Sequence, residues 1–421
     1  MEPKSSSVLV IGQGYVGLPL ACELARVGFS VVGLDTNPER VQALNAGVSG
    51  VETQLDSALA DALERGYTAK TQVDTGELFD VVVVCVPTPL DHGGKVDLTA
   101  VLSAAEVGAK ALKRKGLFIL ESTSFPGTTE EQVLPFLEEA LGTIDQDFYL
   151  AFSPERIDPG NANFDISNTP RIVGGVTQSS GERAAELYRT FLNEVTVLRG
   201  AKEAEMAKLL ENTYRQVNIA LANELSKVSH EMGIDYWEVL RGASTKPYGF
   251  QSFQPGPGVG GHCIPIDPMY LNEKVLGVLG RPLEFVELAQ RVNDEMPQYV
   301  VERTVGWLET HDFNPQSSRV LLLGATYKAD IADRRGAPLD EIFLALRRAG
   351  VSVAFHDPFI TEISLGDEKV SGVPALEIAL NECDLAVLLQ PHSMYKEPGL
   401  FQGCSVFDTR GVLQGLNIER L

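Results

Sequence analysis

A glycine-rich turn between a strand and a helix constrains this chain more than any other feature of its sequence. Residues 8–12 form an apolar run typical of a buried strand, and residues 16–27 have the spacing of a helix. Between them lies Gly12-Gln13-Gly14-Tyr15-Val16-Gly17. Its glycines allow a tight turn, a close approach of the backbone to a pyrophosphate and close packing of helix on strand. The turn therefore predicts a dinucleotide site at a helix N-terminus.

An acidic residue follows the next predicted strand at a distance that suits a dinucleotide. Asp35 comes directly after the apolar run Ser30–Leu34, about twenty residues beyond the turn. From this position a carboxylate accepts hydrogen bonds from both ribose hydroxyls and repels a 2′-phosphate. Asp35 therefore favours NAD over NADP, although the nearby Arg40 weakens the inference.

Short apolar runs and helical stretches alternate through the first half of the chain and again near its end. Strands covered by helices on both faces are typically continuous runs of Val, Ile and Leu. We expect strands at 81–86, 117–121, 148–152, 320–323, 351–356, 385–389 and 405–408, and helices from Pro38, at 98–115 and at 339–349. The alternation predicts an α/β fold with two Rossmann-like, doubly wound parallel sheets.

The middle of the chain has a different pattern. Residues 201–232 contain neither Gly nor Pro and carry apolar side chains at helical spacing, which predicts one long helix. A Gly- and Pro-dense loop follows at 249–268, and another helical stretch is expected at 284–307. We therefore divide the chain into an α/β domain at 1–200, a helical middle domain at 201–314 and a second α/β domain at 315–421.

Composition excludes several classes of function. The chain has 35 basic and 57 acidic side chains, and a net charge of −22 argues against nucleic acid as a partner. No stretch approaches the run of about eighteen apolar residues that spans a membrane. Five cysteines without a secretory signal suit a reducing cytoplasm. Six scattered histidines lack metal-binding spacing, so we expect no metal site and interpret His262 as filling its loop.

The segment 255–267 carries the clearest candidate for covalent chemistry. Four glycines precede Cys263, so the backbone there can approach a ligand closely and offer N–H donors. A thiolate is reactive in an electropositive, partly exposed setting, which an oxidised nicotinamide ring would help to supply. Asp267, four residues later, is a candidate base or water-orienting group.

Other polar groups lie where such folds bind ligands. Lys208 and Asn212 are four residues apart on the predicted long helix, hence on one face, where they can stabilise a developing alkoxide. Glu121-Ser122-Thr123 and Ser153-Pro154-Glu155-Arg156 each follow a predicted strand. Taken alone, the helix pair is more typical of a solvated face, and each strand end is compatible with a cap or a loop.

Together these residues resemble the UDP-glucose/GDP-mannose dehydrogenase family over nearly the whole chain. The motifs are G-Q-G-Y-V-G-L at 12–18, V-P-T-P at 86–89, E-S-T-x-x-x-G-T at 121–128, S-P-E-R at 153–156, K-L-x-x-N at 208–212, G-x-G-G-x-C-x-P-x-D at 258–267 and Y-K…D-x-R at 327–335. The resemblance implies NAD bound by domain 1–200, a nucleotide sugar bound by domain 315–421, and a homodimer or larger homo-oligomer formed through the long helix.

The resemblance also implies a reaction, the four-electron oxidation of a sugar C6 alcohol to a carboxylate with two NAD⁺. Lys208 and Asn212 would stabilise the C6 oxygen, with Asp267 assisting through water. Cys263 would attack the aldehyde to give a thiohemiacetal, whose oxidation leaves a thioester. The water that hydrolyses this thioester would be positioned by Thr123, Glu155 and Asp267.

The remaining site residues follow from the same resemblance. The cofactor is expected to contact Gly12, Gly14, Tyr15, Val16, Gly17, Asp35, Arg40, Pro87, Thr88, Glu121, Thr123 and Arg335. The nucleotide sugar is expected to contact Glu155, Arg156, Lys208, Asn212, Lys246, Gly258, Gly260 and Lys328.

The sequence departs from the commonest family pattern at a few positions. Ile266 replaces a frequent lysine, Ala337 stands where serine often precedes Pro338, and Ser124-Phe125 replaces Val-Pro. The Ile266 form, with E-R-I-D-P-G-N at 155–161 and T-K-P at 245–247, resembles the branch that acts on UDP-N-acetylhexosamines. We therefore expect UDP-N-acetylglucosamine as the substrate, with UDP-glucose, TDP-glucose and GDP-mannose as alternatives.

Two functions of other classes share parts of this pattern. A two-electron dehydrogenase of the hydroxy-acid or 6-phosphogluconate type would have a similar Rossmann domain and Lys/Asn pair. It would need neither a cysteine in a glycine-rich loop nor a second α/β domain. A catalytically silent protein that binds a nucleotide sugar would keep the fold, and it would show no turnover with or without Cys263.

Overall fold

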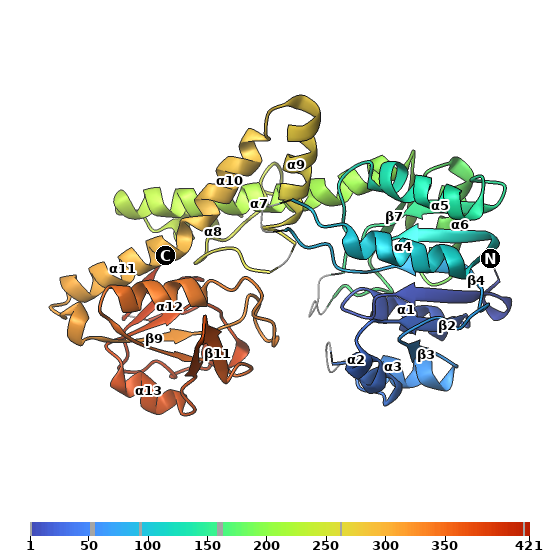
Figure 1. Cartoon of the computed structure of the whole chain (residues 1–421). Helices are drawn as coiled ribbons and strands as arrows, with labels where there is room; N and C mark the ends of the chain where they lie inside the picture. The colour runs from blue at the N-terminus through green and yellow to red at the C-terminus, as the bar shows by residue number, and fades with distance from the viewer. Residues whose placement is uncertain (1, 51–54, 92–94, 158–162, 262, 416) are drawn as a thin grey trace. The chain divides into compact units, whose positions relative to one another are not determined.

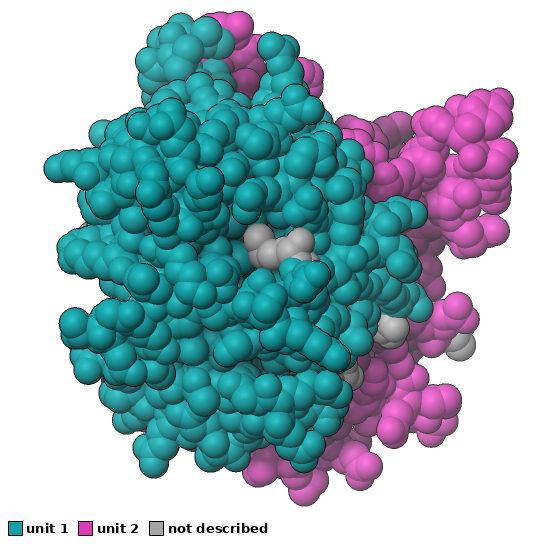
Figure 2. Space-filling model, turned by 90° about the vertical axis from the view of Figure 1, so that its right-hand side faces the viewer, with its two compact units in different colours: residues 1–211, 270–280 teal, residues 212–269, 281–421 magenta. Residues whose placement is uncertain are grey.

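The structure is a computed structural model that describes residues 2–50, 55–91, 95–157, 163–261, 263–415 and 417–421 (Figure 1). The chain divides into two compact units, which Figure 2 shows in separate colours. Unit 1 comprises residues 1–211 and 270–280, and unit 2 comprises residues 212–269 and 281–421. Helix α7 (Ala201–Glu231) begins in unit 1 and continues into unit 2, as one unbroken helix where the sequence predicts one.

Unit 1 is built on a sheet in which eight described strands run in the order β3-β2-β1-β4-β5-β6-β7-β8. Their bounds are β1 Ser7–Ile11, β2 Ser30–Leu34, β3 Thr68–Lys70, β4 Phe79–Val84, β5 Leu112–Leu120, β6 Phe148–Phe152, β7 Arg171–Gly175 and β8 Val195–Leu198. All neighbouring strands are parallel except β6 and β7. Because parallel strands end at one edge, residues that follow β1, β2, β4 and β5 gather there.

Helices cover both faces of this sheet (Figure 1). One core packs α1 (Gly17–Arg26), α2 (Pro38–Asn45), α3 (Leu55–Glu64) and α6 (Gln178–Tyr188) on side chains such as Val8, Val10 and Val83. The other packs α4 (Thr99–Ala111), α5 (Leu134–Leu141) and the start of α7 on side chains such as Leu9, Val82 and Val84. Alternate residues of each strand therefore serve opposite cores, which explains the continuous apolar runs in the sequence.

Unit 2 contains a parallel sheet of five described strands in the order β10-β9-β13-β14-β15. Their bounds are β9 Arg319–Leu323, β10 Ser352–His356, β13 Leu385–Leu388, β14 Val406–Asp408 and β15 Ile418–Arg420, beside a hairpin of β11 Glu362–Leu365 and β12 Glu368–Ser371. Helices α11 (Met296–Thr310) and α12 (Leu339–Arg348) pack on one face, and α13 (Leu376–Glu382) packs on the other. The remaining helices are α8 Tyr236–Ala243, α10 Glu284–Asp294 and α9 Asp267–Leu279, which spans the unit boundary.

The structure differs from the sequence predictions at several places. The helix expected at 98–115 ends at Ala111, because Lys113 and Arg114 already belong to β5, where they pair with Asp80 and Asp147. Six strands were not expected from the sequence, namely β3, β7, β8, β11, β12 and β15, and β7 runs antiparallel to β6.

The helical stretch expected at 284–307 is confirmed as two helices, α10 and α11. Pro297 stands in the first turn of α11, where a missing N–H costs nothing.

A buried carboxylate attaches α7 to the first α/β sheet. Glu205 is fully buried, and its two oxygens accept hydrogen bonds from the main-chain N–H of Gly127 (2.6 Å) and of Thr129 (2.8 Å). The Thr129 hydroxyl donates to it as well, at 2.7 Å. These donors lie in the loop that follows β5 and opens the turn Thr129–Val133 ahead of α5. Glu205 thus connects the first turns of α7 to the carboxyl edge of the sheet.

Removing this carboxylate is expected to destabilise unit 1. Glu205→Ala leaves three donors without their acceptor, so the free energy of unfolding should fall by about 2–4 kcal/mol. Denaturant unfolding followed by circular dichroism measures the change. Glu203→Ala, at an exposed position two residues earlier on α7, is the matched control and should cost less than about 1 kcal/mol.

The pKa of Glu205 determines how the loss of stability in Glu205→Ala should depend on pH. Burial raises the pKa to about 7, although the hydrogen bonds from Thr129 and Gly127 oppose that shift. A raised pKa means that the folded state binds the proton more tightly, so this stabilisation is complete below the unfolded pKa and is lost as pH rises through 7. The loss caused by Glu205→Ala should therefore be larger at about pH 5 than at about pH 8. A loss independent of pH would contradict this assignment.

Candidate active site

The glycine-rich turn in unit 1 has the geometry that its sequence predicts. Gly12 has φ +92°, and a Cβ there would lie 2.4 Å from the Cys85 carbonyl oxygen. A Cβ on Gly17 would lie 1.9 Å from the carbonyl oxygen of Gly12. Gly14 differs, because no atom lies within 4 Å of the position that its Cβ would occupy. The first and third glycines are thus required by packing, and the second leaves open space beside the backbone.

Asp35 is held in place at the end of β2. Its carboxylate accepts hydrogen bonds from the main-chain N–H of Gln13 (3.0 Å) and of Asn37 (3.0 Å). The Gln13 side chain is buried beneath the turn, where it donates to the Val10 carbonyl and accepts from the Tyr67 hydroxyl. These contacts join the turn after β1 to the acid after β2.

A cavity of about 970 Å³ opens at this edge of unit 1. It is lined by the glycine-rich turn, by Asp35 and by Cys85, Val86 and Pro87 after β4, and α4 contributes apolar residues such as Ala104 and Val107. Its size, its largely apolar wall and the open space at Gly14 fit a dinucleotide, with the phosphates against the turn and the ribose at Asp35.

The other residues predicted to bind the cofactor do not line this cavity. Arg40 donates instead to the carbonyl oxygens of Gln13 (3.0 and 2.5 Å) and Ser49 (2.6 Å). Thr88 is buried, and its hydroxyl donates to the Thr123 carbonyl at 2.8 Å, which links the loops after β4 and β5. The predicted cofactor residues of unit 1 outside the lining are Tyr15, Val16, Gly17, Arg40, Thr88, Glu121 and Thr123.

The predicted substrate residues of unit 1 lie where α7 meets the segment after β6. Lys208 Nζ donates to the main-chain oxygen of Glu155 at 2.6 Å. Arg156 forms an ion pair with Glu211 at 2.7 Å, also on α7. The Glu155 side chain is largely buried and contacts Arg171, a residue that sequence reasoning missed. Arg171 stands at the start of an apolar run in the sequence. A cation buried in a sheet needs an acidic partner, so this pattern could have indicated a contact with an acid.

In unit 2, the cysteine lies just ahead of helix α9. The Cys263 carbonyl accepts hydrogen bonds from the main-chain N–H of Ile266 (3.3 Å) and Asp267 (2.8 Å), and the helix begins at Asp267. Cys263 is exposed. It lies at the N-terminal side of α9, the end of a helix that stabilises negative charge. Asp267 is buried and accepts a hydrogen bond of 2.5 Å from Asn212 Nδ2.

The cysteine loop packs against the segment that carries the Y-K…D-x-R motif, also in unit 2. A Cβ on Gly260 would lie 2.7 Å from that of Tyr327 and 2.8 Å from the Gly336 carbonyl oxygen. The Gly261 N–H donates to the Arg335 carbonyl at 2.9 Å. Two motifs about seventy residues apart in sequence therefore form one structure, and glycine is needed where they touch.

Three other predicted site residues, Arg335, Lys328 and Lys246, belong to unit 2. Arg335 forms an ion pair with Asp333 at 2.6 Å, and Lys328 is half-buried in the same segment. Lys246 is exposed, with its ammonium 5.3 Å from the centre of the Tyr248 ring. His262 and residues 158–161 of the E-R-I-D-P-G-N motif are outside the described residues.

The turn that follows β9 in the second α/β sheet resembles the glycine-rich turn after β1 but carries different side chains. The Gly324 N–H donates to His356 O, as Gly12 does to Leu34 O, and the Ala325 N–H donates to Asp357 Oδ2 at 2.6 Å. Thr326 occupies the place of the open Gly14 and is buried. The Asp357 carboxylate also lies 2.9 Å from Nε2 of the buried His392. The second turn thus has a buried threonine where the first has an open glycine, and its acid contacts a buried histidine.

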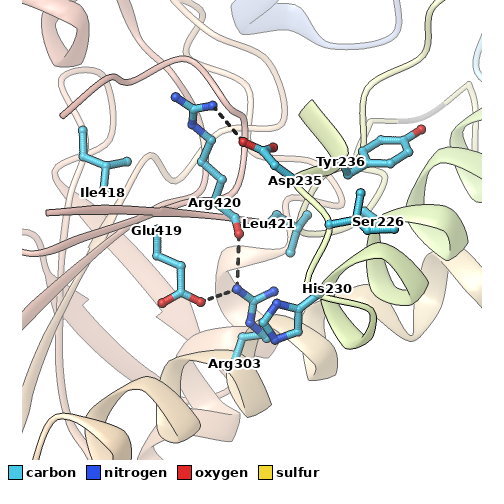
Figure 3. A pocket seen from close by; sticks show the side chains of 11 residues that line it. Ser226, His230, Asp235, Tyr236, Arg303, Ile418, Glu419, Arg420 and Leu421 are labelled. Atoms are coloured by element: carbon cyan, nitrogen blue, oxygen red, sulfur yellow. Dashed lines mark hydrogen bonds and ion pairs between the residues drawn. The ribbon is translucent and has the colours of Figure 1, made fainter. Parts of the chain in front are cut away.

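A separate cavity of about 420 Å³ lies near the last strand of unit 2 (Figure 3). Figure 3 shows Arg303 directed at Glu419 and at the main-chain oxygen of Arg420, which lies 3.2 Å away. Arg420 in turn lies 3.7 Å from Asp235. The charges that line this cavity are paired with one another, so its arginines attach β15 to α11 and to the segment before α8.

No helix within the described ranges is both long enough and apolar enough to cross a membrane.

Comparison with known proteins identifies the family. Residues 6–192 match the NAD binding domain of the UDP-glucose/GDP-mannose dehydrogenase family. Residues 202–295 match its central domain, and residues 321–415 match its UDP binding domain.

Individual relatives match over almost their whole length. A UDP-N-acetyl-D-glucosamine 6-dehydrogenase of Pseudomonas aeruginosa is 38% identical, covering 94% of this chain and 93% of the relative. A UDP-N-acetyl-D-mannosamine dehydrogenase of Methanococcus maripaludis is 34% identical, covering 97% and 93%. The solved structure of a UDP-D-ManNAc dehydrogenase from Pyrococcus horikoshii is 31% identical, covers 98% of both chains and superimposes with a TM-score of 0.88.

The matched domains cover the chain from the glycine-rich turn to the second α/β sheet, and the dinucleotide cavity coincides with the NAD binding domain. This chain therefore belongs to the UDP-glucose/GDP-mannose dehydrogenase family and is an NAD-dependent oxidoreductase of the nucleotide-sugar dehydrogenase type.

Proposed function

We propose that this protein oxidises the C6 hydroxyl of a UDP-N-acetylhexosamine to a carboxylate, using two NAD⁺ per sugar. The balanced reaction takes up one water and releases two NADH and three protons. The observation that carries the proposal is the position of Cys263, exposed at the N-terminal side of α9, next to the buried Asn212–Asp267 pair. A two-electron dehydrogenase needs no thiol, whereas oxidation of an aldehyde proceeds readily from a thiohemiacetal.

Unit 2 contributes the groups for covalent catalysis. The Cys263 thiolate adds to the aldehyde carbon, and loss of hydride from the thiohemiacetal leaves a thioester. Asn212 holds the Asp267 carboxylate with a hydrogen bond of 2.5 Å, which fixes this group for proton transfer through water. The amide of Asn212 is also proposed to stabilise the C6 oxygen, as the sequence resemblance implies.

Unit 1 contributes a cation and a second carboxylate. Lys208 is held by the Glu155 carbonyl, so its ammonium has a fixed position for stabilising a developing alkoxide. Glu155 and Thr123 are proposed to orient the hydrolytic water. The loop that contains Thr123 is fixed by the Thr88 hydroxyl, 2.8 Å from the Thr123 carbonyl.

The cofactor site fits NAD and disfavours NADP. When bound, NAD⁺ accepts the hydride in each oxidation step. Gly12, Gly14 and Asp35 are the residues proposed to hold it, because they line the cavity and leave space for the pyrophosphate. Arg40 is engaged with two carbonyl oxygens and does not line the cavity, so it offers a 2′-phosphate no compensation for repulsion by Asp35.

UDP-N-acetylglucosamine is the proposed substrate, and UDP-N-acetylmannosamine is the second candidate. Relatives named for each sugar match this chain along nearly its whole length, at 38% and 34% identity. The residues proposed to contact the nucleotide sugar, beyond those with catalytic roles, are Arg156, Lys246, Gly258, Gly260 and Lys328. UDP-glucose is a weaker candidate, because Ile266 stands where a lysine is frequent in the family.

The proposed assembly is a homodimer formed through α7. In unit 2, this helix exposes an apolar stripe of Tyr214, Leu221, Leu225 and Val228. Their spacing of seven, four and three residues places them on one helix face. An exposed apolar stripe of this kind is typical of an interface between protein chains.

The first prediction for this function concerns stoichiometry and the thiol. With UDP-N-acetylglucosamine, the wild type should form two NADH per sugar consumed. Cys263→Ser should reduce acid formation by on the order of a thousandfold, because the covalent intermediate is lost. NADH absorbance and mass spectrometry of the sugar product measure both quantities.

Cys383→Ser, which changes another thiol of unit 2, is the matched control and should leave turnover unchanged. One NADH per sugar would refute the four-electron reaction. Uronate formation at the native rate by Cys263→Ser would refute the covalent role. A panel of UDP-N-acetylglucosamine, UDP-N-acetylmannosamine, UDP-glucose and GDP-mannose identifies the sugar, and turnover of UDP-glucose alone would overturn the proposed substrate.

The second prediction concerns the choice of cofactor. Asp35→Asn should lower the ratio of kcat/KM for NAD to that for NADP by about 10–100-fold, because a charge-assisted hydrogen bond to the ribose and a repulsive charge are both removed. Initial rates with each cofactor give the ratio. Glu39→Gln removes the same charge from a nearby residue outside the cavity and should leave the ratio unchanged. An unaltered ratio in Asp35→Asn would disprove the assignment.

The third prediction concerns assembly. Leu221→Glu places a charge in the middle of the stripe, so the mass measured by light scattering in solution should fall from that of a dimer to that of a monomer. Gln298→Glu adds the same charge at an exposed position on α11, outside the stripe, and should leave the mass unchanged. A wild-type monomer, or a dimeric Leu221→Glu variant, would exclude this interface.

A further inference from the structure

A buried charged cluster lies at the ends of β5 and β6 in unit 1. We define the Arg171 cluster as Arg171, Glu121, Glu155 and Tyr188. Arg171 Nη1 donates to Glu121 Oε1 at 2.5 Å, and Nη2 donates to Glu155 Oε2 at 3.3 Å. The exposed fractions of the Arg171, Glu121 and Glu155 side chains are 5%, 0% and 10%. One guanidinium therefore joins the acid that ends β5 to the acid that follows β6.

The rest of the cluster acts on Glu121 and Arg171. The Tyr188 hydroxyl donates to Glu121 Oε1, and its ring centre lies 4.6 Å from the guanidinium carbon of Arg171. Tyr188 is fully buried at the end of α6. It therefore contacts both Arg171 and the acid that Arg171 binds, and limits the positions that the guanidinium can take.

The charges in the cluster are unequal, with one cation between two acids. Burial is the largest cause that raises the pKa of Glu121, to about 7, while the Arg171 charge opposes the shift and the Glu155 charge adds to it. Below neutral pH Glu121 is therefore mostly protonated. Arg171 then keeps its contact with Glu155, the second acid that it binds.

Other contacts fix the remaining polar atoms of Glu155. Its Oε1 accepts a hydrogen bond from the Ile157 N–H, and its main-chain oxygen accepts one from Lys208 at 2.6 Å. Its Oε2 is held by Arg171. A change at Arg171 therefore acts on one carboxylate oxygen and leaves the Lys208 contact in place.

We propose that Arg171 is a positioning residue for the hydrolytic half of the reaction, an inference that rests on the proposed function. In that half, the water oxygen bonds to the thioester carbon while one water proton passes to the Glu155 carboxylate. The C–S bond breaks, and the sulfur leaves as the Cys263 thiolate. Arg171 fixes the orientation of the Glu155 side chain for accepting the proton, and Glu121 and Tyr188 keep Arg171 in place.

The test separates hydrolysis from the oxidation steps. Arg171→Lys keeps the charge but loses the fork that contacts both acids. In rapid-quench experiments with UDP-N-acetylglucosamine and NAD⁺, this variant should form the first two NADH per active site within about threefold of the native rate. Its steady-state kcat should fall by about 10–100-fold, the range for loss of assistance by a general base. Intact-mass measurement should then show the protein accumulating as the acylated form.

Two further variants control for a purely structural role. Arg189→Lys changes an exposed arginine of unit 1, which is paired with Glu182, and should behave as the wild type. Tyr188→Phe removes only the hydroxyl that donates to Glu121. The hydrogen bond from Arg171 to Glu121 should then strengthen at the expense of its contact with Glu155. The acylated fraction should therefore rise by about 2–5-fold. If Arg171→Lys does not fold, Tyr188→Phe decides the question alone.

The outcomes distinguish this inference from the proposed function. If the wild type forms one NADH per sugar, the four-electron reaction itself is wrong. If the wild type forms two NADH but the folded variants slow both oxidations and hydrolysis equally, or accumulate no acylated protein, Arg171 has no positioning role. Selective accumulation of the acylated protein supports it, because a general loss of structure would not separate the two halves.

Discussion

The carboxylate of Glu205 is the contact on which the functional edge of unit 1 depends. It lies one turn before Lys208 on α7, and its oxygens bind the main-chain N–H groups of Gly127 and Thr129 in the loop after β5. That loop begins with the E-S-T motif, whose Thr123 is bound by Thr88. One buried acid therefore positions helix α7 and a strand-end loop together. Neither could shift alone without leaving buried donors unpaired.

Features set by local spacing could be predicted from the sequence. The turn that contains Gly12 and Gly14, the strand Ser30–Leu34 and the long helix α7 are found where the pattern places them, because apolar periodicity and glycine geometry act over short distances. The position of Asp35 beside the cavity followed from the same rule, since the acid must come after the second strand.

Contacts between distant residues could not be predicted in this way. Arg171 lies 50 residues from Glu121 along the chain, and Glu205 lies 76 residues from Thr129, so no periodicity links the partners. The contacts of Arg40 were likewise not evident from its place near Asp35 in the sequence, because its guanidinium donates to the carbonyl oxygens of Gln13 and Ser49. Buried ionic pairs become visible only when tertiary packing brings the strand ends together.

The altered turn of the second α/β sheet has a consequence for the order of events in catalysis. Thr326 stands there in place of an open glycine, and His392 lies against Asp357, so of these two turns only the first has the open position that suits a pyrophosphate. In the proposed reaction with two NAD⁺, the first NADH would therefore leave and a second NAD⁺ bind at the same turn while the half-oxidised sugar stays bound. The proposed covalent bond to Cys263 would hold the sugar during this exchange.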